Sequence, residues 1–154
     1  MLRSLILIIL FAFMACLVGA GAIEGPQACA RCGMDRTSFA HSRAIVAYSD
    51  GSSSGTCSLH CAVEEMQAAG TKRVAALQVA DFNSKELVDA RGATWVVGGK
   101  QNGVMTSPAK WAFGRADQAQ QFVREYGGKV TPFEQVLLVV QEEVAEMART
   151  PELE

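Results

Sequence analysis

The pattern of hydrophobic and polar positions predicts a series of short strands. Five short segments are rich in apolar and β-branched residues, or adjoin a turn signal, as is typical of strands. They lie at residues 44–48, 55–57, 74–79, 94–97 and 110–113.

Three longer segments have the 3.6-residue period of amphipathic helices. They lie at residues 59–69, 116–126 and 132–149. Ser58 and Thr131 stand where a helix N-cap is expected, because each precedes the first apolar position of its helix.

The order strand–strand–helix–strand occurs twice if residues 129–130 form a brief strand. We therefore expect an α+β fold with two small β-β-α-β halves packed together, plus a C-terminal helix. The expected divisions after the N-terminal segment are a metal-binding loop (23–41), a first half (42–82), a second half (83–131) and the last helix (132–149).

Residues 1–22 resemble a secretory signal peptide or membrane anchor. Arg3 precedes an apolar run over residues 5–15, and Ala20-Gly21-Ala22 resembles a cleavage site. Cys16 is an alternative lipoprotein processing site, and an uncleaved apolar segment is a third possibility. All three place the rest of the chain in the periplasm or cell envelope, with membrane contact only through this N-terminal anchor.

The composition argues against several classes of function. The chain has 154 residues, a formal charge of −2 and 7% aromatic residues, so it lacks the basic, aromatic surface of nucleic-acid-binding proteins. No hydrolase motif and no phosphate-binding glycine loop is present, so we do not expect an enzyme. Glu64-Glu65 and Glu142-Glu143 are expected to lie on solvated helix faces.

The first candidate site is Cys29-Ala30-Arg31-Cys32-Gly33-Met34. Two thiols three positions apart can face one ion, and Gly33 allows the turn that would bring Cys32 and Met34 to the same ion. A set of thiolate and thioether ligands favours Cu(I), whereas zinc rarely accepts methionine.

The second candidate is the pair Cys57 and Cys61, at an expected junction of strand and helix. With Cys29 and Cys32 it can complete a four-thiolate Zn(II) site. It can equally form disulfides in an exported protein. We interpret His60 as an exposed residue at the helix start.

Two other possibilities remain. Met105 lies in a loop between two expected strands and becomes a candidate ligand if that loop folds over the first motif. A thiol–disulfide oxidoreductase using Cys29 and Cys32 is the weakest alternative, because no strand precedes the motif and Gly33 follows it at once. His41 has no evident partner and is expected on the surface.

Several of these residues, taken in order, resemble the NosL family of copper(I)-binding accessory lipoproteins for nitrous oxide reductase. They are Cys32-Gly33-Met34, Met105, Trp111-Ala112-Phe113-Gly114, Asp117 to Phe122 and Tyr126-Gly127-Gly128. The resemblance covers roughly residues 29–135 and implies the same two β-β-α-β halves.

The resemblance also implies a function. Cys32, Met34 and Met105 would hold copper for delivery to a periplasmic cuproenzyme, nitrous oxide reductase, with help from a membrane ABC transporter complex. Cys57 and Cys61 are not part of that family's pattern. With Cys29 and Cys32 they resemble YHS/TRASH-type modules, which favour zinc.

Overall fold

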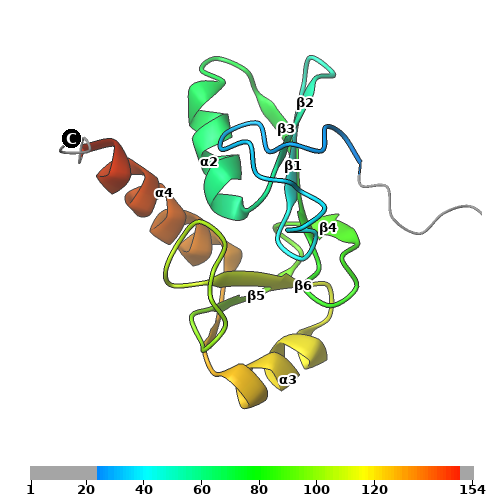
Figure 1. Cartoon of the computed structure of the whole chain (residues 1–154), viewed down its shortest axis with the longest axis vertical. Helices are drawn as coiled ribbons and strands as arrows, with labels where there is room; N and C mark the ends of the chain where they lie inside the picture. The colour runs from blue at the N-terminus through cyan, green and yellow to red at the C-terminus, as the bar shows by residue number, and fades with distance from the viewer. Residues whose placement is uncertain (1–23, 150–154) are drawn as a thin grey trace, which may run out of the picture.

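The computed structural model describes residues 24–149, which form two small antiparallel sheets and three helices (Figure 1). The strands are β1 (Ala44–Tyr48), β2 (Ser53–Thr56), β3 (Val74–Ala80), β4 (Leu87–Asp89), β5 (Thr94–Val97), β6 (Lys110–Phe113) and β7 (Lys129–Thr131). The helices are α2 (Leu59–Ala68), α3 (Ala116–Tyr126) and α4 (Phe133–Arg149). None of the helices described is long and apolar enough to cross a membrane.

The first sheet has the strand order β2-β1-β3-β4. Its central strand β1 carries Ala44 and Val46, which are fully buried because they share the face of the strand that packs against α2. β2 pairs with one edge of β1 in a register that sets Ala44 opposite Thr56. The last residue of β2 therefore lies beside the first residue of β1, and the candidate ligand Cys57 follows directly after it.

The second sheet has the order β6-β5-β7 and is covered by α3. Phe113 and Phe122 pack together between the sheet and this helix, with their ring centroids 5.3 Å apart. Gly128 has φ of +90°, and a Cβ there would lie 2.9 Å from the carbonyl oxygen of Gly98. Only glycine fits without strain where the chain turns back from α3 into β7.

α4 joins the two halves through a shared hydrophobic core. It packs against α2 and β5, and in Figure 1 it lies alongside α2. Val136 and Val140 are fully buried among residues of both halves, including Val63 of α2 and Trp95 of β5. The Trp95 indole N–H donates to the Ala90 carbonyl oxygen at 2.8 Å, so this buried polar group is satisfied.

The predicted α+β class and the twofold β-β-α-β order are confirmed. The predicted short strand at 55–57 begins and ends earlier, at Ser53–Thr56, which leaves Cys57 outside the ladder. Strand β4 was not predicted, because its three residues are too few to show a period. The predicted signal or anchor at residues 1–22, with Cys16, lies outside the described residues.

Candidate metal centre

The first arm of the site is the loop that carries Cys29 and Cys32. An isolated antiparallel bridge between Ala28 and Asp35 closes its base. Within the loop, the Cys29 N–H donates to the Met34 carbonyl oxygen at 2.9 Å, and the Gly33 N–H donates to the Cys29 carbonyl oxygen at 3.0 Å. Gly33 has φ of +75°, the conformation for which the sequence suggested a glycine.

The second arm is the junction between β2 and α2. Cys57 directly follows β2, and Cys61 lies in the first turn of α2. Ser58 caps the helix, because its hydroxyl accepts a hydrogen bond from the Cys61 N–H at 3.4 Å. The two arms are joined by the Ala30 N–H, which donates to the Gly55 carbonyl oxygen at 2.9 Å.

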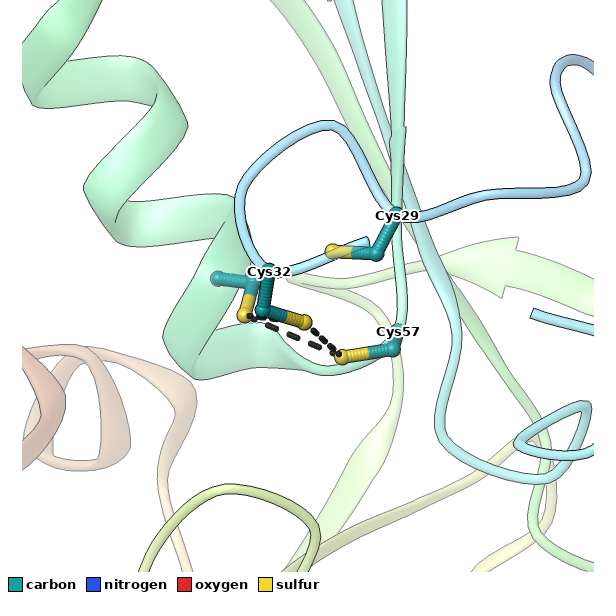
Figure 2. A group of neighbouring side chains, drawn as sticks. Cys29, Cys32 and Cys57 are labelled. Carbon is teal, nitrogen blue, oxygen red and sulfur yellow. Dashed lines mark hydrogen bonds between the residues drawn. The ribbon is translucent and has the colours of Figure 1, made fainter. Parts of the chain in front are cut away.

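The four cysteine sulfurs converge between these arms, and all lie within 4.8 Å of one another. Three of the separations are 3.5 Å for Cys32–Cys57, 3.7 Å for Cys57–Cys61 and 3.8 Å for Cys61–Cys32. Figure 2 shows the sulfurs of Cys29, Cys32 and Cys57 pointing toward a common centre. All four are free thiols; Cys29, Cys57 and Cys61 are buried, and Cys32 is the exposed member.

The spacing of the sulfurs fits a single ion. Four thiolates at the zinc–sulfur distance, in a tetrahedron, stand about 3.8 Å apart. The centre of the triangle formed by Cys32, Cys57 and Cys61 lies about 2.1 Å from each sulfur, which is shorter than the usual metal–sulfur bond. Cys32, Cys57 and Cys61 would therefore hold an ion together with Cys29, the remaining thiol within reach.

The thiols of Cys32, Cys57 and Cys61 differ in pKa. The hydrogen bond between the sulfurs of Cys57 and Cys61 lowers the pKa of Cys57 to about 6 and raises the pKa of Cys61 above its usual range. Desolvation raises the pKa of Cys32 to about 11, because its sulfur points inward although the residue is exposed. Cys57 is thus the most acidic of these three thiols, and a cation would have to displace protons from Cys32 and Cys61.

Apolar side chains cover the sulfur cluster. Met34, Phe39 and Val104 are partly buried and pack against the buried cysteines. Met34 therefore lies beside the cluster, and Phe39 and Val104 are neighbours that were not foreseen. The contact of Val104 means that the loop between β5 and β6 reaches the sulfur cluster.

Met105 is placed differently from its neighbour Val104. Its side chain is 40% exposed, and it is not among the residues packed against the cluster. It lines a separate cavity of about 680 Å³ between the β5–β6 loop and α4, together with Glu143 and Met147. The structure thus brings Cys29, Cys32, Cys57, Cys61 and Met34 together and leaves Met105 to one side.

The two histidines are more buried than the sequence suggested. The expectation that His60 is exposed was wrong: it is 2% exposed, and its Nε2 lies 3.9 Å from a Glu64 carboxylate oxygen. His41 is half-buried and contacts the rings of Phe82 and Trp111. Burial lowers the pKa of both, so each is neutral at pH 7, and neither belongs to the group of converging ligands.

Sequence reasoning missed two charged residues near the site. Arg36 is fully buried beneath the loop of Cys29 and Cys32. Glu143, expected on a solvated face, instead accepts a hydrogen bond from the buried Lys110 ammonium at 2.6 Å. No sequence pattern marks the burial of a single arginine or glutamate, so the contacts of Arg36 and Glu143 could not be predicted.

Comparisons with known proteins place this geometry in context. The family model for NosL matches residues 20–140. The fold is similar to the crystal structure of the copper chaperone NosL from Shewanella denitrificans, with a TM-score of 0.57 and 24% sequence identity. That match covers 75% of this chain and 93% of the other, and at this identity it establishes a shared fold. No curated protein matches the sequence.

Proposed function

This chain belongs to the NosL family, and from that premise we propose that it is a copper(I)-binding metallochaperone rather than an enzyme. The observation that carries the proposal is the convergence of four thiols within 4.8 Å, with the thioether residue Met34 packed against them. Thiolate and thioether sulfurs are soft ligands, and such sets select Cu(I) among biological metals.

The arrangement suits a carrier, because one of the four ligand residues is exposed at the surface. Cys57 and Cys61 are fully buried and would hold the ion, whereas Cys32 is the exposed member of the group. A soft ligand from a recipient protein can approach from that side. It would form a bond to the copper as the bond to Cys32 breaks, so the ion need not be released into water.

The recipient and the cellular location extend the same proposal. The family resemblance supports a periplasmic cuproenzyme, nitrous oxide reductase, as the recipient, with a membrane ABC transporter complex as a further partner. The signal-like residues 1–22 support export to the periplasm or cell envelope. A lipid on Cys16 or an uncleaved helix would then serve as the anchor.

A zinc-binding module is the second candidate function. It is favoured by the sulfur separations of 3.5–3.8 Å, which are close to the roughly 3.8 Å edge of a tetrahedral zinc–thiolate site. In that case Cys29, Cys32, Cys57 and Cys61 would hold a structural Zn(II). The function would then lie in a surface that binds a partner.

The test is a titration of the reduced protein with Cu(I) under anaerobic conditions, in competition with a chromogenic chelator. The wild type is compared with Met34→Leu, and Met66→Leu serves as the matched control because Met66 packs against the main core instead. Tight Cu(I) binding that weakens only in Met34→Leu would support the chaperone. Binding that is indifferent to Met34, with one zinc retained through purification, would replace it with the zinc module.

A further inference from the structure

Arg36 is a fully buried arginine that lies where the two arms of the metal site meet. Its Nε donates to the Thr56 carbonyl oxygen at 3.2 Å, and its Nη1 donates to the carbonyl oxygens of Glu24 and Pro26 at 2.7 and 2.8 Å. Its Nη2 donates to the Ala44 carbonyl oxygen and to a Glu24 carboxylate oxygen, both at 3.4 Å. The guanidinium thus uses every nitrogen, as a buried charge requires.

These acceptors belong to separate segments of the chain. Glu24 and Pro26 lead into the loop of the first cysteine pair, and Thr56 is the residue immediately before Cys57. Arg36 itself follows that loop, and its N–H donates to the Gln27 carbonyl oxygen at 2.8 Å. One side chain therefore fixes both ends of the first arm to the start of the second.

The charge of Arg36 is partly offset within the same network, because Arg36 shares the Glu24 carboxylate with Arg43. Glu24 also accepts two hydrogen bonds from the Arg43 guanidinium, at 2.8 and 2.9 Å. Burial lowers the pKa of Arg36, and the nearby Glu24 carboxylate opposes that shift, whereas the Arg43 guanidinium adds to it. The guanidinium is therefore held close to the sulfur cluster as a cation.

Gly55 shows how closely the guanidinium is packed. A Cβ at this position would lie 2.5–2.9 Å from three atoms of the Arg36 guanidinium, so a larger residue would displace it. The Gly55 carbonyl oxygen also accepts the hydrogen bond from Ala30 that joins the arms. The Arg36 guanidinium therefore packs directly against the backbone at Gly55, which lies two residues before Cys57.

We propose that Arg36 is a positioning residue that fixes the distance between the pair Cys29/Cys32 and the pair Cys57/Cys61, so that the four sulfurs converge before a metal ion arrives. The proposal rests on the metal-binding function proposed above. Without the guanidinium, binding of the ion would have to order the two arms. The free-energy cost of that ordering would lower the affinity for the metal ion. A lysine cannot replace the guanidinium, because its single ammonium cannot reach acceptors on all these segments.

The test uses Co²⁺ as a probe, because its visible spectrum reports the number of thiolates around it. The reduced protein is titrated anaerobically as wild type, Arg36→Lys and Gly55→Ala, and Arg91→Lys is the matched control because Arg91 is exposed at the surface. Denaturant unfolding of each metal-free protein is measured in parallel. We expect at least tenfold weaker Co²⁺ affinity and a weaker tetrahedral band in Arg36→Lys and Gly55→Ala, with no change in Arg91→Lys.

The outcomes separate the two proposals. Folded Arg36→Lys and Gly55→Ala proteins that keep the wild-type affinity and spectrum would overturn the positioning role and leave the metal centre intact. Loss of folding in both would assign Arg36 to the stability of the fold alone, which also overturns it. Failure of the wild type to bind Co²⁺ would overturn the preformed four-thiolate site and the positioning role with it, whereas the Cu(I) titration described above tests the chaperone separately.

Discussion

Replacing Cys57 with serine removes one of the buried sulfurs of the metal centre. The Cys57 sulfur lies 3.5 Å from that of Cys32 and 3.7 Å from that of Cys61. It is fully buried, so no thiol from elsewhere in the described chain can substitute for it. Serine has nearly the same shape but offers a hard oxygen, which a soft ion binds poorly.

The size of the effect follows from the number of ligands. Four-ligand structural zinc sites contribute about 10–16 kcal/mol of binding free energy, which is about 3 kcal/mol per ligand. Losing one thiolate should then weaken binding by about 3 kcal/mol, or roughly two orders of magnitude in Kd. The loss should be at least as large for Cu(I), because Cu(I) discriminates more strongly against oxygen.

The assay is competition with a chelator under reducing, anaerobic conditions, for Cu(I) and for Zn(II) separately. Ala62→Ser is the matched control, because it also introduces a fully buried hydroxyl, but on α2 in the main core. We expect Ala62→Ser to lower stability and leave metal affinity unchanged. A Cys57→Ser protein that binds either ion within threefold of the wild type would refute the reasoning that Cys57 is a ligand.

Three further predictions concern the scaffold around the site. In urea unfolding, Glu143→Gln should lower the free energy of unfolding by about 3 kcal/mol, because it leaves the Lys110 ammonium without its anion and the Lys110 side chain is only 4% exposed. The control Glu134→Gln, at the surface, should cause no measurable change. Burial raises the pKa of the Asp81 carboxyl, but hydrogen bonds from backbone N–H groups outweigh burial and hold that pKa below its usual range. The stabilisation that Asp81 contributes is therefore present above about pH 4 and is lost as pH falls through the folded-state pKa. The difference in stability between the wild type and Asp81→Asn should close in acid unfolding curves, and a constant difference would contradict this. Gly128→Ala should cost about 2 kcal/mol or more in thermal unfolding, because the new Cβ would collide with backbone at a positive φ, and an unchanged Tm would show that the turn can relax.

The local pattern of the chain was enough to predict most of its elements. The amphipathic period over residues 116–126 gave α3 with the same bounds as in the structure, and the apolar segment at 44–48 gave β1. β4 was missed because three residues carry no period, and it exists through its pairing with β3. It is the second strand of a hairpin in which Leu87 pairs with Ala80, and the pattern of its three residues alone does not express that pairing.

The sequence by itself determined which residue types are available for chemistry: two cysteine pairs, a methionine after the first pair, and a glycine that allows the turn between them. Only the tertiary structure decided that the four thiols meet, that Met34 joins them and that Met105 lines another cavity. It also decided that His60 is buried and that Arg36 crosses between the arms. The physical reason is that spacing along the chain constrains neighbours within a turn or a strand, whereas the distance between the arms is set by the pairing of β1 with β2 and by one buried guanidinium.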